Sequence, residues 1–348
     1  METLRRDFLK QVALGAAAIP LVGSTRAIAA TDEPISGDPK LMGEAKYVDV
    51  DGIRTRYFDG GTGEAIVLVH GGQWPAVASA ERWSAIFDHL AANFHVYAFD
   101  KLGMGYTDNP KTDADYSMGG VTRHAYGFIQ ALGLSRVTLV GHSRGALPIA
   151  RIAVDHPELV ANLVILDSNT LAPDDPNTPP RVDLPAERTP PTRDEMWQSR
   201  MSNPTVYNKD FITEAYVDAQ HRIAHLPKIQ EIHTKFQEAR DRWIEENPEM
   251  VEQRPAFARN RGATTWWLYE TKYETLDLIK AGNLKSPTLI VWGYNDPGAP
   301  YFLAVNLMET VSAVVDRAEL HIINKCGHSV AEEQPETVAR LITGFANG

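Results

Sequence analysis

The sequence predicts an α/β fold: a mainly parallel sheet flanked by helices, with an inserted helical cap. Over residues 45–166, short apolar runs typical of buried strands alternate with segments of helical spacing, and this alternation resumes at residue 287. Between these parts lies a stretch, residues 171–191, that is rich in Pro, Asp and Thr and is followed by helical patterns only. The chain of 348 residues is long enough for one large domain of this kind.

The first 29 residues are predicted to be an export signal and not part of the fold. Arg5-Arg6 belongs to a twin-arginine pattern, and the apolar stretch at residues 12–22 is too short and too rich in Ala and Gly for a membrane span. Residues 27–29, Ala-Ile-Ala, fit the small-x-small rule for signal cleavage. We therefore expect the twin-arginine (Tat) export machinery to recognise the precursor. The mature domain, residues 30–348, is expected in the periplasm without a membrane anchor; the alternative is an amphipathic N-terminal helix of the mature protein.

The first strands of the mature chain have clear local signals. Residues 45–50 and 53–58 alternate around Asp51-Gly52, which favours a hairpin because both turn residues need a positive φ. The continuous apolar run 65–69 suits a strand buried on both faces, and it ends in the glycine-rich loop His70-Gly71-Gly72-Gln73. In the same half of the chain the patterns predict helices over 83–92 and 116–132 and strands over 95–99 and 137–140.

The strand at 137–140 is broken sharply by Gly-x-Ser-x-Gly at residues 141–145. Between a strand and the helix predicted over 147–155, this motif is typical of a nucleophile elbow, which lifts the Ser143 hydroxyl out of the sheet. Gly141 and Gly145 suit the tight turn because a Cβ at either position would crowd it. An ordinary turn between a strand and a helix is the alternative.

After a strand predicted at 163–166, the alternation stops. Helical patterns cover 193–202, 210–225, 229–246 and 264–280, and strands return at 287–292 and 320–323. The simplest arrangement is a helical cap at about residues 170–280, inserted between two strands and lying over the carboxyl-terminal edge of the sheet, where open α/β sheets bind ligands. Five aromatic residues of this cap are candidates for the walls of a substrate cavity or for the core of the cap: Trp197, Tyr207, Trp243, Trp266 and Trp267.

A serine hydroxyl becomes a good nucleophile only when a base takes its proton and an acid holds that base in the correct tautomer. The predicted base is His328, which follows a strand end and a glycine and comes last in the chain order serine, acid, histidine. The predicted acid is Asp296, in the loop after the strand at 287–292. Asp167, at the end of the strand at 163–166, is the rival acid.

The oxyanion donors are predicted to be the backbone N–H groups of Arg144 and Gly72, with Gln73 as the alternative to Gly72. His70 and Asp100 stand at strand ends and are predicted to brace loops by hydrogen bonds. Cys326 lies two residues from His328, but it has no activating elbow and is predicted to be a small packing residue.

The composition excludes several classes of partner. A net charge of -11 disfavours binding to nucleic acid or to an anionic membrane surface. The single cysteine excludes an intrachain disulfide, and no Cys/His spacing suggests a zinc site. We therefore expect a small-molecule substrate and neither a metal nor an organic cofactor.

Five segments together resemble the α/β-hydrolase superfamily: residues 70–72, 99–108, 141–145, 293–296 and 326–328. Within it, the chain resembles the meta-cleavage-product hydrolases, which split carbon–carbon bonds in vinylogous diketones; the matching pieces are residues 105–110, 116–118, 206–214 and 324–328. The resemblance implies an α/β-hydrolase fold and the roles of nucleophile, acid and base for Ser143, Asp296 and His328. It also implies that Gly72 and Arg144 hold the oxyanion positions.

The chain departs from the meta-cleavage family at two positions. Ser329 directly follows His328, where the family usually has Trp. Gln220 stands at the position of a cap arginine that contacts the keto-acid end of the substrate in the family, and Arg222 lies two residues further on. The side chain of Arg144 is also unusual in an elbow, where it would meet an anionic substrate group or an acid of the protein.

From these residues we predict an exported serine hydrolase that cleaves a small ester-type substrate through Ser143, His328 and Asp296. One alternative is a carbon–carbon bond hydrolase that acts on a diketone or meta-cleavage-type product. Another is a non-catalytic binding protein on the same fold, because fold does not determine function.

Overall fold

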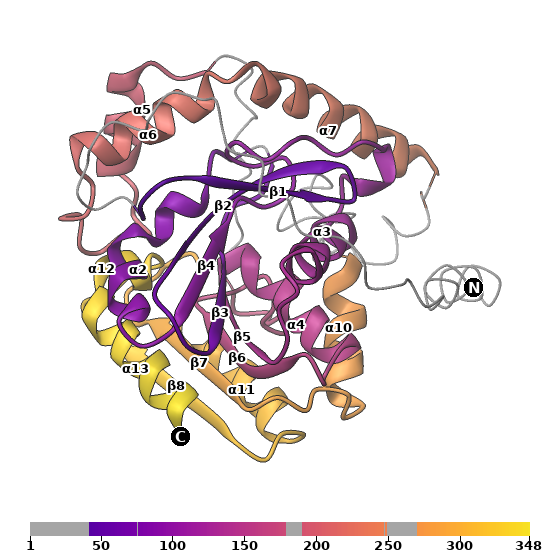
Figure 1. Ribbon diagram of the computed structural model, residues 1–348, viewed down its shortest axis with the longest axis vertical. Coiled ribbons are helices and arrows are strands. Elements are labelled where there is room, and N and C mark those ends of the chain that lie inside the picture. The colour runs from indigo at the N-terminus through magenta and orange to yellow at the C-terminus, as the bar shows by residue number, and fades with distance from the viewer. Residues whose placement is uncertain (1–41, 75, 179–189, 247, 249–269) are drawn as a thin grey trace.

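The computed structural model describes residues 42–74, 76–178, 190–246, 248 and 270–348. Its centre is a sheet of eight strands in the order β1-β2-β4-β3-β5-β6-β7-β8 (Figure 1). β1 and β2 pair antiparallel, β2 pairs antiparallel with β4, and the remaining neighbours are parallel. The strands are β1 (Lys46–Val50), β2 (Ile53–Gly60), β3 (Ala65–Val69), β4 (His95–Phe99), β5 (Val137–His142), β6 (Val160–Leu166), β7 (Thr288–Gly293) and β8 (Ala318–Ile323). The predicted α/β class is confirmed.

The residues of the central strands alternate between two apolar cores, one on each face of the sheet. In β3, Val67 and Val69 pack on one face, whereas Ile66 and Leu68 pack on the other. The first face is covered by α3 (Met118–Ala131), α4 (Ala146–Asp155), α10 (Glu270–Lys280) and α11 (Phe302–Ser312). The second is covered by α2 (Ser84–Ala91), α12 (Val330–Glu333) and α13 (Pro335–Asn347). Because both faces are buried, the strands are continuous apolar runs.

The boundaries of several elements follow from local chemistry. Asp51 and Gly52 both have positive φ, 50° and 80°, so the two-residue hairpin turn forms as predicted. The helix predicted over 116–132 begins at Met118, because the Ser117 side chain accepts a hydrogen bond from the backbone N–H of Gly120 and caps it. The helix predicted over 210–225 begins at Glu214, where the Thr213 side chain caps the first turn in the same way.

Three helices inserted between β6 and β7 lie over one end of the sheet (Figure 1). They are α5 (Arg193–Met201), α6 (Glu214–Ala224) and α7 (Pro227–Glu246). The predicted cap range ran to about residue 280, but α10 packs against α4, α3 and α11 and its Leu276 and Ile279 are part of the core of the sheet. The last helix before β7 therefore belongs to the sheet layer.

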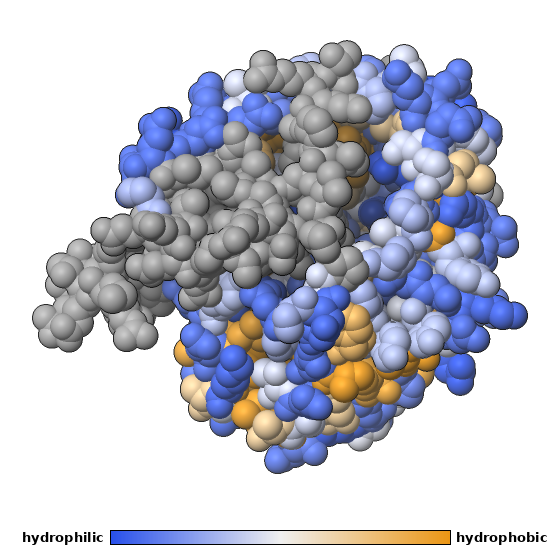
Figure 2. Space-filling model, turned by 180° about the vertical axis from the view of Figure 1, so that it is seen from behind, coloured by the Kyte–Doolittle hydropathy of each residue, from blue (hydrophilic) through white to orange (hydrophobic). Residues whose placement is uncertain are grey.

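On the face turned away from the viewer of Figure 1, the described residues are mostly hydrophilic, with apolar side chains gathered toward the lower end (Figure 2). None of the described helices combines the length and the apolar character needed to cross a membrane. The predicted export signal, residues 1–29, lies outside the described residues.

Candidate active site

The turn between β5 and α4 holds Ser143 in a strained backbone conformation. Ser143 has a φ of 52°, which is unusual for a residue with a side chain. The two glycines make the turn sterically feasible: a Cβ on Gly141 would lie 2.6 Å from the carbonyl oxygen of Gly145, and a Cβ on Gly145 would lie 2.2 Å from that of Val69. Ser168 Oγ donates to the carbonyl oxygen of Ser143 at 2.6 Å and supports the turn from below. The predicted elbow is present.

The Ser143 hydroxyl lies within hydrogen-bond distance of His328. Ser143 Oγ is 2.9 Å from His328 Nε2, and His328 Nδ1 is 2.7 Å from Asp296 Oδ2. Asp296 also accepts a hydrogen bond from the backbone N–H of Gly298 at 2.7 Å. A carboxylate at Nδ1 keeps the proton on that nitrogen, which leaves Nε2 free to accept one from the serine. The structure thus brings together the three residues predicted from the sequence.

A second carboxyl group reaches the same imidazole nitrogen. Asp167 Oδ1 lies 3.2 Å from His328 Nδ1, and Asp167 Oδ2 accepts a hydrogen bond from the backbone N–H of Gly293 at 2.9 Å. Burial lowers the pKa of His328, but Asp296 and Asp167 outweigh burial and raise it to about 10. Asp296 makes the shorter contact, yet the two acids that the sequence left as rivals are both present at the site.

The glycine-rich loop after β3 lies directly against the elbow. A Cβ on Gly71 would be 3.1 Å from Ser143 Cβ, and Gly72 has a φ of 71°, which favours glycine. His70 Nδ1 lies 2.7 Å from the carbonyl oxygen of Gly71, and His70 Nε2 accepts from the backbone N–H of Lys101. Because a trans peptide directs its C=O and N–H to opposite sides, this bond turns the Gly72 N–H away from His70. His70 therefore braces the loop, as predicted.

Lys101 is a second support of this loop, and sequence reasoning missed it. Its side chain is buried, and its Nζ donates to the carbonyl oxygen of Gly72 at 2.5 Å and to Gln73 Oε1 at 3.0 Å. Burial and the charge of Arg144 hold the pKa of Lys101 well below its usual range. Arg144 itself reaches the loop, since its Nη1 lies 3.4 Å from the carbonyl oxygen of Gln73. Nothing in the sequence around a lysine that follows a strand indicates that its side chain will support a distant loop.

Asp100 braces the other side of the loop. Its carboxylate makes two hydrogen bonds with the buried guanidinium of Arg56, at 2.7 and 3.2 Å, and accepts from the backbone N–H groups of Ala80 and Tyr106. Burial raises the pKa of Asp100, but the Arg56 charge outweighs burial and the pKa falls below its ordinary value. The predicted structural role of Asp100 agrees with these bonds.

The loop that carries His328 is joined to the cap by one carboxylate, that of Glu333. Glu333 is buried and accepts hydrogen bonds from four backbone N–H groups: Gly327 at 2.9 Å, Ser329 at 3.2 Å, Tyr207 at 3.1 Å and Asn208 at 2.9 Å. The backbone N–H of His328 also donates to the carbonyl oxygen of Thr205 at 2.7 Å. Sequence analysis missed Glu333, because an acid in a helical pattern gives no sign that it binds backbone groups of a distant segment.

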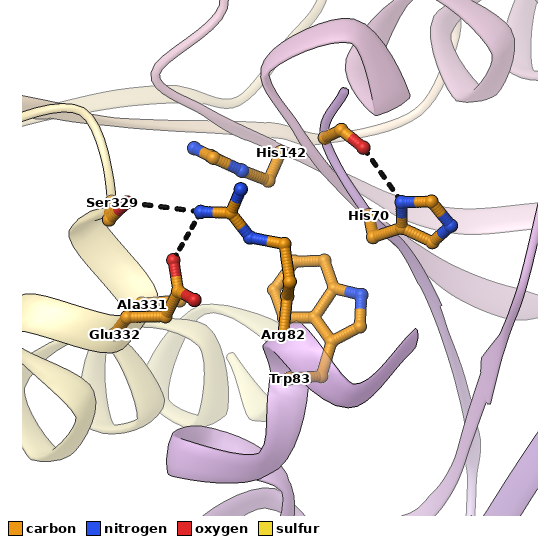
Figure 3. Close-up of a pocket in the computed structure, with 8 residues that line it drawn as sticks. His70, Arg82, Trp83, His142, Ser329, Ala331 and Glu332 are labelled. Carbon is orange, nitrogen blue, oxygen red and sulfur yellow. Dashed lines mark hydrogen bonds and ion pairs between the residues drawn. The ribbon is translucent and has the colours of Figure 1, made fainter. Parts of the chain in front are cut away.

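A small pocket lined by Ser329, the residue after His328, is drawn in Figure 3. Its volume is about 10 Å³, enough for about one water molecule. Arg82 points across it toward Ser329 and Glu332 and donates to Ser329 Oγ at 3.1 Å and to Glu332 Oε2 at 2.5 Å. His142 lines the pocket and donates from Nε2 to the carbonyl oxygen of His328 at 2.7 Å. Ser329, at the position where the related family has Trp, thus binds Arg82.

A larger cavity of about 340 Å³ lies between the cap and the sheet domain. It extends from Ala78, which packs on Gly72, to Gln220 and Arg222 of α6. Gln220, predicted at the position of the family's cap arginine, is buried and accepts from Arg200 Nε at 2.6 Å. Guanidinium groups from both cap helices therefore lie close to this position: Arg200 of α5 binds Gln220, and Arg222 of α6 lines the cavity.

The predicted aromatic walls are only partly within the described residues. Trp197 is half-buried and packs on the apolar core formed by α5 and α6, and Tyr207 is exposed. The Trp243 side chain and residues 266–267 lie outside what the structure describes. Cys326 is fully buried, and burial raises the pKa of its thiol, in agreement with a packing role.

One cluster of three side chains in the described part of the chain has the composition of a metal site: Asp167, Asp296 and His328. Their ligand atoms lie within 4.8 Å of one another. The same atoms make the hydrogen bonds described above, with His328 Nδ1 bound to both carboxyl groups. The arrangement is that of a histidine oriented by acids.

Comparisons with known proteins agree with this geometry. Residues 64–335 match the family described as alpha/beta hydrolase fold. The chain is 28% identical to 2-hydroxy-6-oxo-6-(2'-aminophenyl)hexa-2,4-dienoic acid hydrolase of Metapseudomonas resinovorans, over 90% of this chain and 94% of the relative. It is 26% identical to 2-hydroxymuconate semialdehyde hydrolase of Pseudomonas sp. strain CF600, over 84% and 90%.

Solved structures lead to the same conclusion. The serine hydrolase involved in carbazole degradation (CarC enzyme) superimposes with a TM-score of 0.63 at 25% identity, over 87% of this chain and 98% of the other. With the elbow, the strand order and a family match that covers most of the chain, the conclusion is plain: this chain belongs to the α/β-hydrolase fold family.

Proposed function

We propose that this protein is a carbon–carbon bond hydrolase that acts on a carboxylated vinylogous diketone of the meta-cleavage type. The observation that carries the proposal is the array of Ser143, His328 and Asp296, with separations of 2.9 and 2.7 Å. We assign Ser143 as the nucleophile, His328 as the base and Asp296 as the acid that orients it. Three side chains from separate loops in this geometry support an enzyme over a non-catalytic binding protein.

The names of the relatives support the choice of bond. The substrate named for the Metapseudomonas enzyme carries a 2-hydroxyl, a 6-ketone and a carboxylic acid joined by a diene. The named groups include no ester or amide, so a hydrolase for that compound has to break a carbon–carbon bond. We therefore favour the carbon–carbon alternative over the ester substrate predicted from the sequence, for which the relatives give no support.

Two arginines near the cavity support a carboxylated substrate. Arg200 and Arg222 make no ion pair with a carboxylate among the described residues: Arg200 binds Gln220, and Arg222 binds the Tyr106 hydroxyl. Burial lowers the pKa of Arg200, as expected for a guanidinium whose charge is not compensated. An anionic group in the cavity would supply the missing counter-charge.

The residues of the site account for each step of such a hydrolysis. Ser143 Oγ attacks the ketone carbon while His328 Nε2 takes its proton, and the N–H groups of Gly72 and Arg144 bind the oxyanion. The bond to the neighbouring carbon then breaks, and its electron pair stays on that carbon, which takes a proton. This pair is stabilised only if the 2-hydroxy enol has first become a ketone, so that the departing group is a conjugated enolate. Water then releases the acyl group from Ser143 as a carboxylic acid.

A comparison of two substrates tests the proposal. The purified enzyme is assayed with 2-hydroxy-6-oxo-6-phenylhexa-2,4-dienoate, followed by loss of the dienol absorbance, and with p-nitrophenyl butyrate. We expect kcat/KM to be greater for the dienoate by about a hundredfold or more. A preference for the ester would overturn the carbon–carbon assignment, and activity of Ser143→Ala on both substrates would overturn the nucleophile. Circular dichroism of the variant checks that it is folded.

We also propose that the precursor is exported through the twin-arginine pathway, on the basis of Arg5-Arg6 and the cleavage pattern at residues 27–29. Fractionation of cells that express the full chain should find the activity in the periplasm. Replacement of Arg5-Arg6 by two lysines should leave the precursor in the cytoplasm, and unchanged periplasmic activity would contradict the proposal.

A further inference from the structure

Asp167 is a buried carboxyl group that the proposed mechanism does not use. It follows β6 directly, it is fully buried, and it has a φ of 42°, which a residue with a side chain seldom adopts. Strained residues of this kind persist where the surrounding structure holds them, and they concentrate at functional sites. Here the Gly293 N–H holds Asp167 Oδ2, and Oδ1 is directed at His328 Nδ1.

Two carboxyl groups compete for the one hydrogen on His328 Nδ1. His328 Nδ1 carries a single hydrogen, and the shorter of its two contacts is with Asp296, at 2.7 Å against 3.2 Å for Asp167. A carboxyl oxygen of Asp296 and one of Asp167 lie within 4.8 Å of each other, and the neighbouring Asp167 helps to lower the pKa of Asp296. Like charges this close in a dry site cannot both be ionised.

We propose that Asp167 is a protonated carboxylic acid in the resting enzyme, and that it donates its proton to the ionised Asp296. Asp167 is then a positioning residue: it acts on the reaction through Asp296 and His328. This inference rests on the proposed roles of Ser143, His328 and Asp296. The charged and titratable groups that face the pair are His328 and the Cys326 thiol. The charge of Glu333 acts in turn on the Cys326 thiol.

The electrostatics agree with this division of the proton. Burial raises the pKa of Asp167 well above its usual range and Asp296 adds to the rise, which outweighs the effect of His328. For Asp296, burial is outweighed by His328, and the pKa is lowered. Two ionised acids would hold the His328 pKa near 10, so the imidazole would be charged at neutral pH and could not take the serine proton. A neutral Asp167 removes one of those two charges.

The protonation state can be measured without a substrate. The infrared spectrum of the resting enzyme in D₂O at neutral pH should contain the C=O stretch of a buried carboxylic acid, which shifts when aspartate is labelled with ¹³C in the carboxyl group. Asp167→Asn should remove this band. Ser143→Ala should keep it, and so should Asp100→Asn, which replaces a buried but ionised acid on a neighbouring strand. Absence of the band from the wild type, or its persistence in Asp167→Asn, overturns the proposal.

Kinetics provide a second test, in a set of three variants that circular dichroism shows to be folded. Asn resembles the protonated acid, so Asp167→Asn should lower kcat by no more than about tenfold. Asp296→Asn should cost more, but less than the roughly 10⁴-fold typical of a lost triad acid, because Asp167 can ionise in its place. The double variant should show the full loss. A larger loss in Asp167→Asn than in Asp296→Asn would identify Asp167 as the ionised acid and overturn the proposal. Because the infrared band does not depend on turnover, an enzyme that fails to cleave the dienoate yet has the band contradicts the proposed function alone.

Discussion

The Glu333 carboxylate accepts a hydrogen bond from the backbone N–H of Gly327, at 2.9 Å, one residue before His328. The same carboxylate oxygen binds the backbone N–H groups of Tyr207 and Asn208, which belong to the inserted segment between β6 and β7. A single side chain therefore binds both the loop that carries His328 and the inserted segment of the cap.

We expect Glu333→Gln to lower both stability and turnover. The amide would place an NH₂ group against N–H donors, and hydrogen bonds to charged groups contribute about 1.5–3 kcal/mol each. The free energy of unfolding, measured in urea, should fall by about 2–3 kcal/mol, and kcat should fall by a larger factor than KM rises. The control is Glu336→Gln, an exposed acid in the first turn of α13. Equal effects of the two substitutions would contradict a special role for Glu333.

Lys101→Met should slow catalysis and leave substrate binding nearly unchanged. Methionine keeps the volume of the buried side chain but cannot donate to Gly72 and Gln73, so the oxyanion loop loses its support. We expect kcat to fall by about 10–100-fold, less than the loss of an oxyanion donor itself. Lys228→Met is the matched control, because Lys228 also donates from a partly buried position to a carbonyl oxygen, that of Thr107. A fall in kcat in both variants alike would argue against the role of Lys101.

Substitution of Arg200 should weaken binding of carboxylated substrates. Arg200→Gln removes a guanidinium that binds Gln220 beside the cavity, and KM for the dienoate should rise by about tenfold. KM for the methyl ester of the same compound, which lacks the charge, should change little. Arg193→Gln provides the control, since Arg193 is paired with Glu214 and Asp218 on the same cap. If the two substitutions change KM for both substrates equally, Arg200 stabilises the fold of the cap and does not bind the substrate carboxylate.

The elbow glycine Gly145 should not tolerate a methyl group. A Cβ there would meet the carbonyl oxygens of Val69 and His70 at 2.2 and 2.6 Å, which are backbone atoms at the end of β3. We expect Gly145→Ala to cost about 3 kcal/mol or more of unfolding free energy, or to prevent folding. In contrast, Gly344→Ala in α13 meets nothing within 4 Å and should stabilise the protein by about 0.5–1 kcal/mol. Thermal and urea unfolding measure the stability of the two variants. A Gly145→Ala protein as stable as Gly344→Ala would contradict the prediction.

The pair of Arg56 and Asp100 should make stability depend on pH in the acid range. The folded pKa of Asp100 is lowered, so its contribution is fully present above the unfolded pKa of about 4 and is lost as pH falls through the folded value. Asp100→Asn should cost about 3 kcal/mol at pH 7, because it breaks a buried ion pair and leaves Arg56 with Glu81 as its remaining carboxylate partner. The difference from the wild type should narrow below about pH 4. A stability difference between the wild type and Asp100→Asn that grows as the pH falls would contradict this prediction.

The sequence predicted those elements whose signals are local. The hairpin at Asp51-Gly52, the buried strands and the elbow at Ser143 depend on neighbouring residues, and all three are present. The end of the cap was placed too late, because the apolar pattern of α10 does not say which surface that pattern covers. Ester hydrolysis was predicted because hydrolases that cleave different kinds of bond share the same elbow and partner residues. The names of the relatives instead favour a carbon–carbon bond.

By itself the sequence determined the fold class and predicted the elbow that carries Ser143 and the chain order of its partners, because these follow from periodicity, glycine sterics and loop position at strand ends. Only the tertiary structure decided how distant groups meet. It placed Asp167 and Asp296 on one nitrogen of His328, although 129 residues separate the two acids in the chain. It also brought Lys101 to the oxyanion loop and Glu333 to the cap. The physical reason is that a buried polar group must find its partners in space, and no local pattern records which partners the fold will supply.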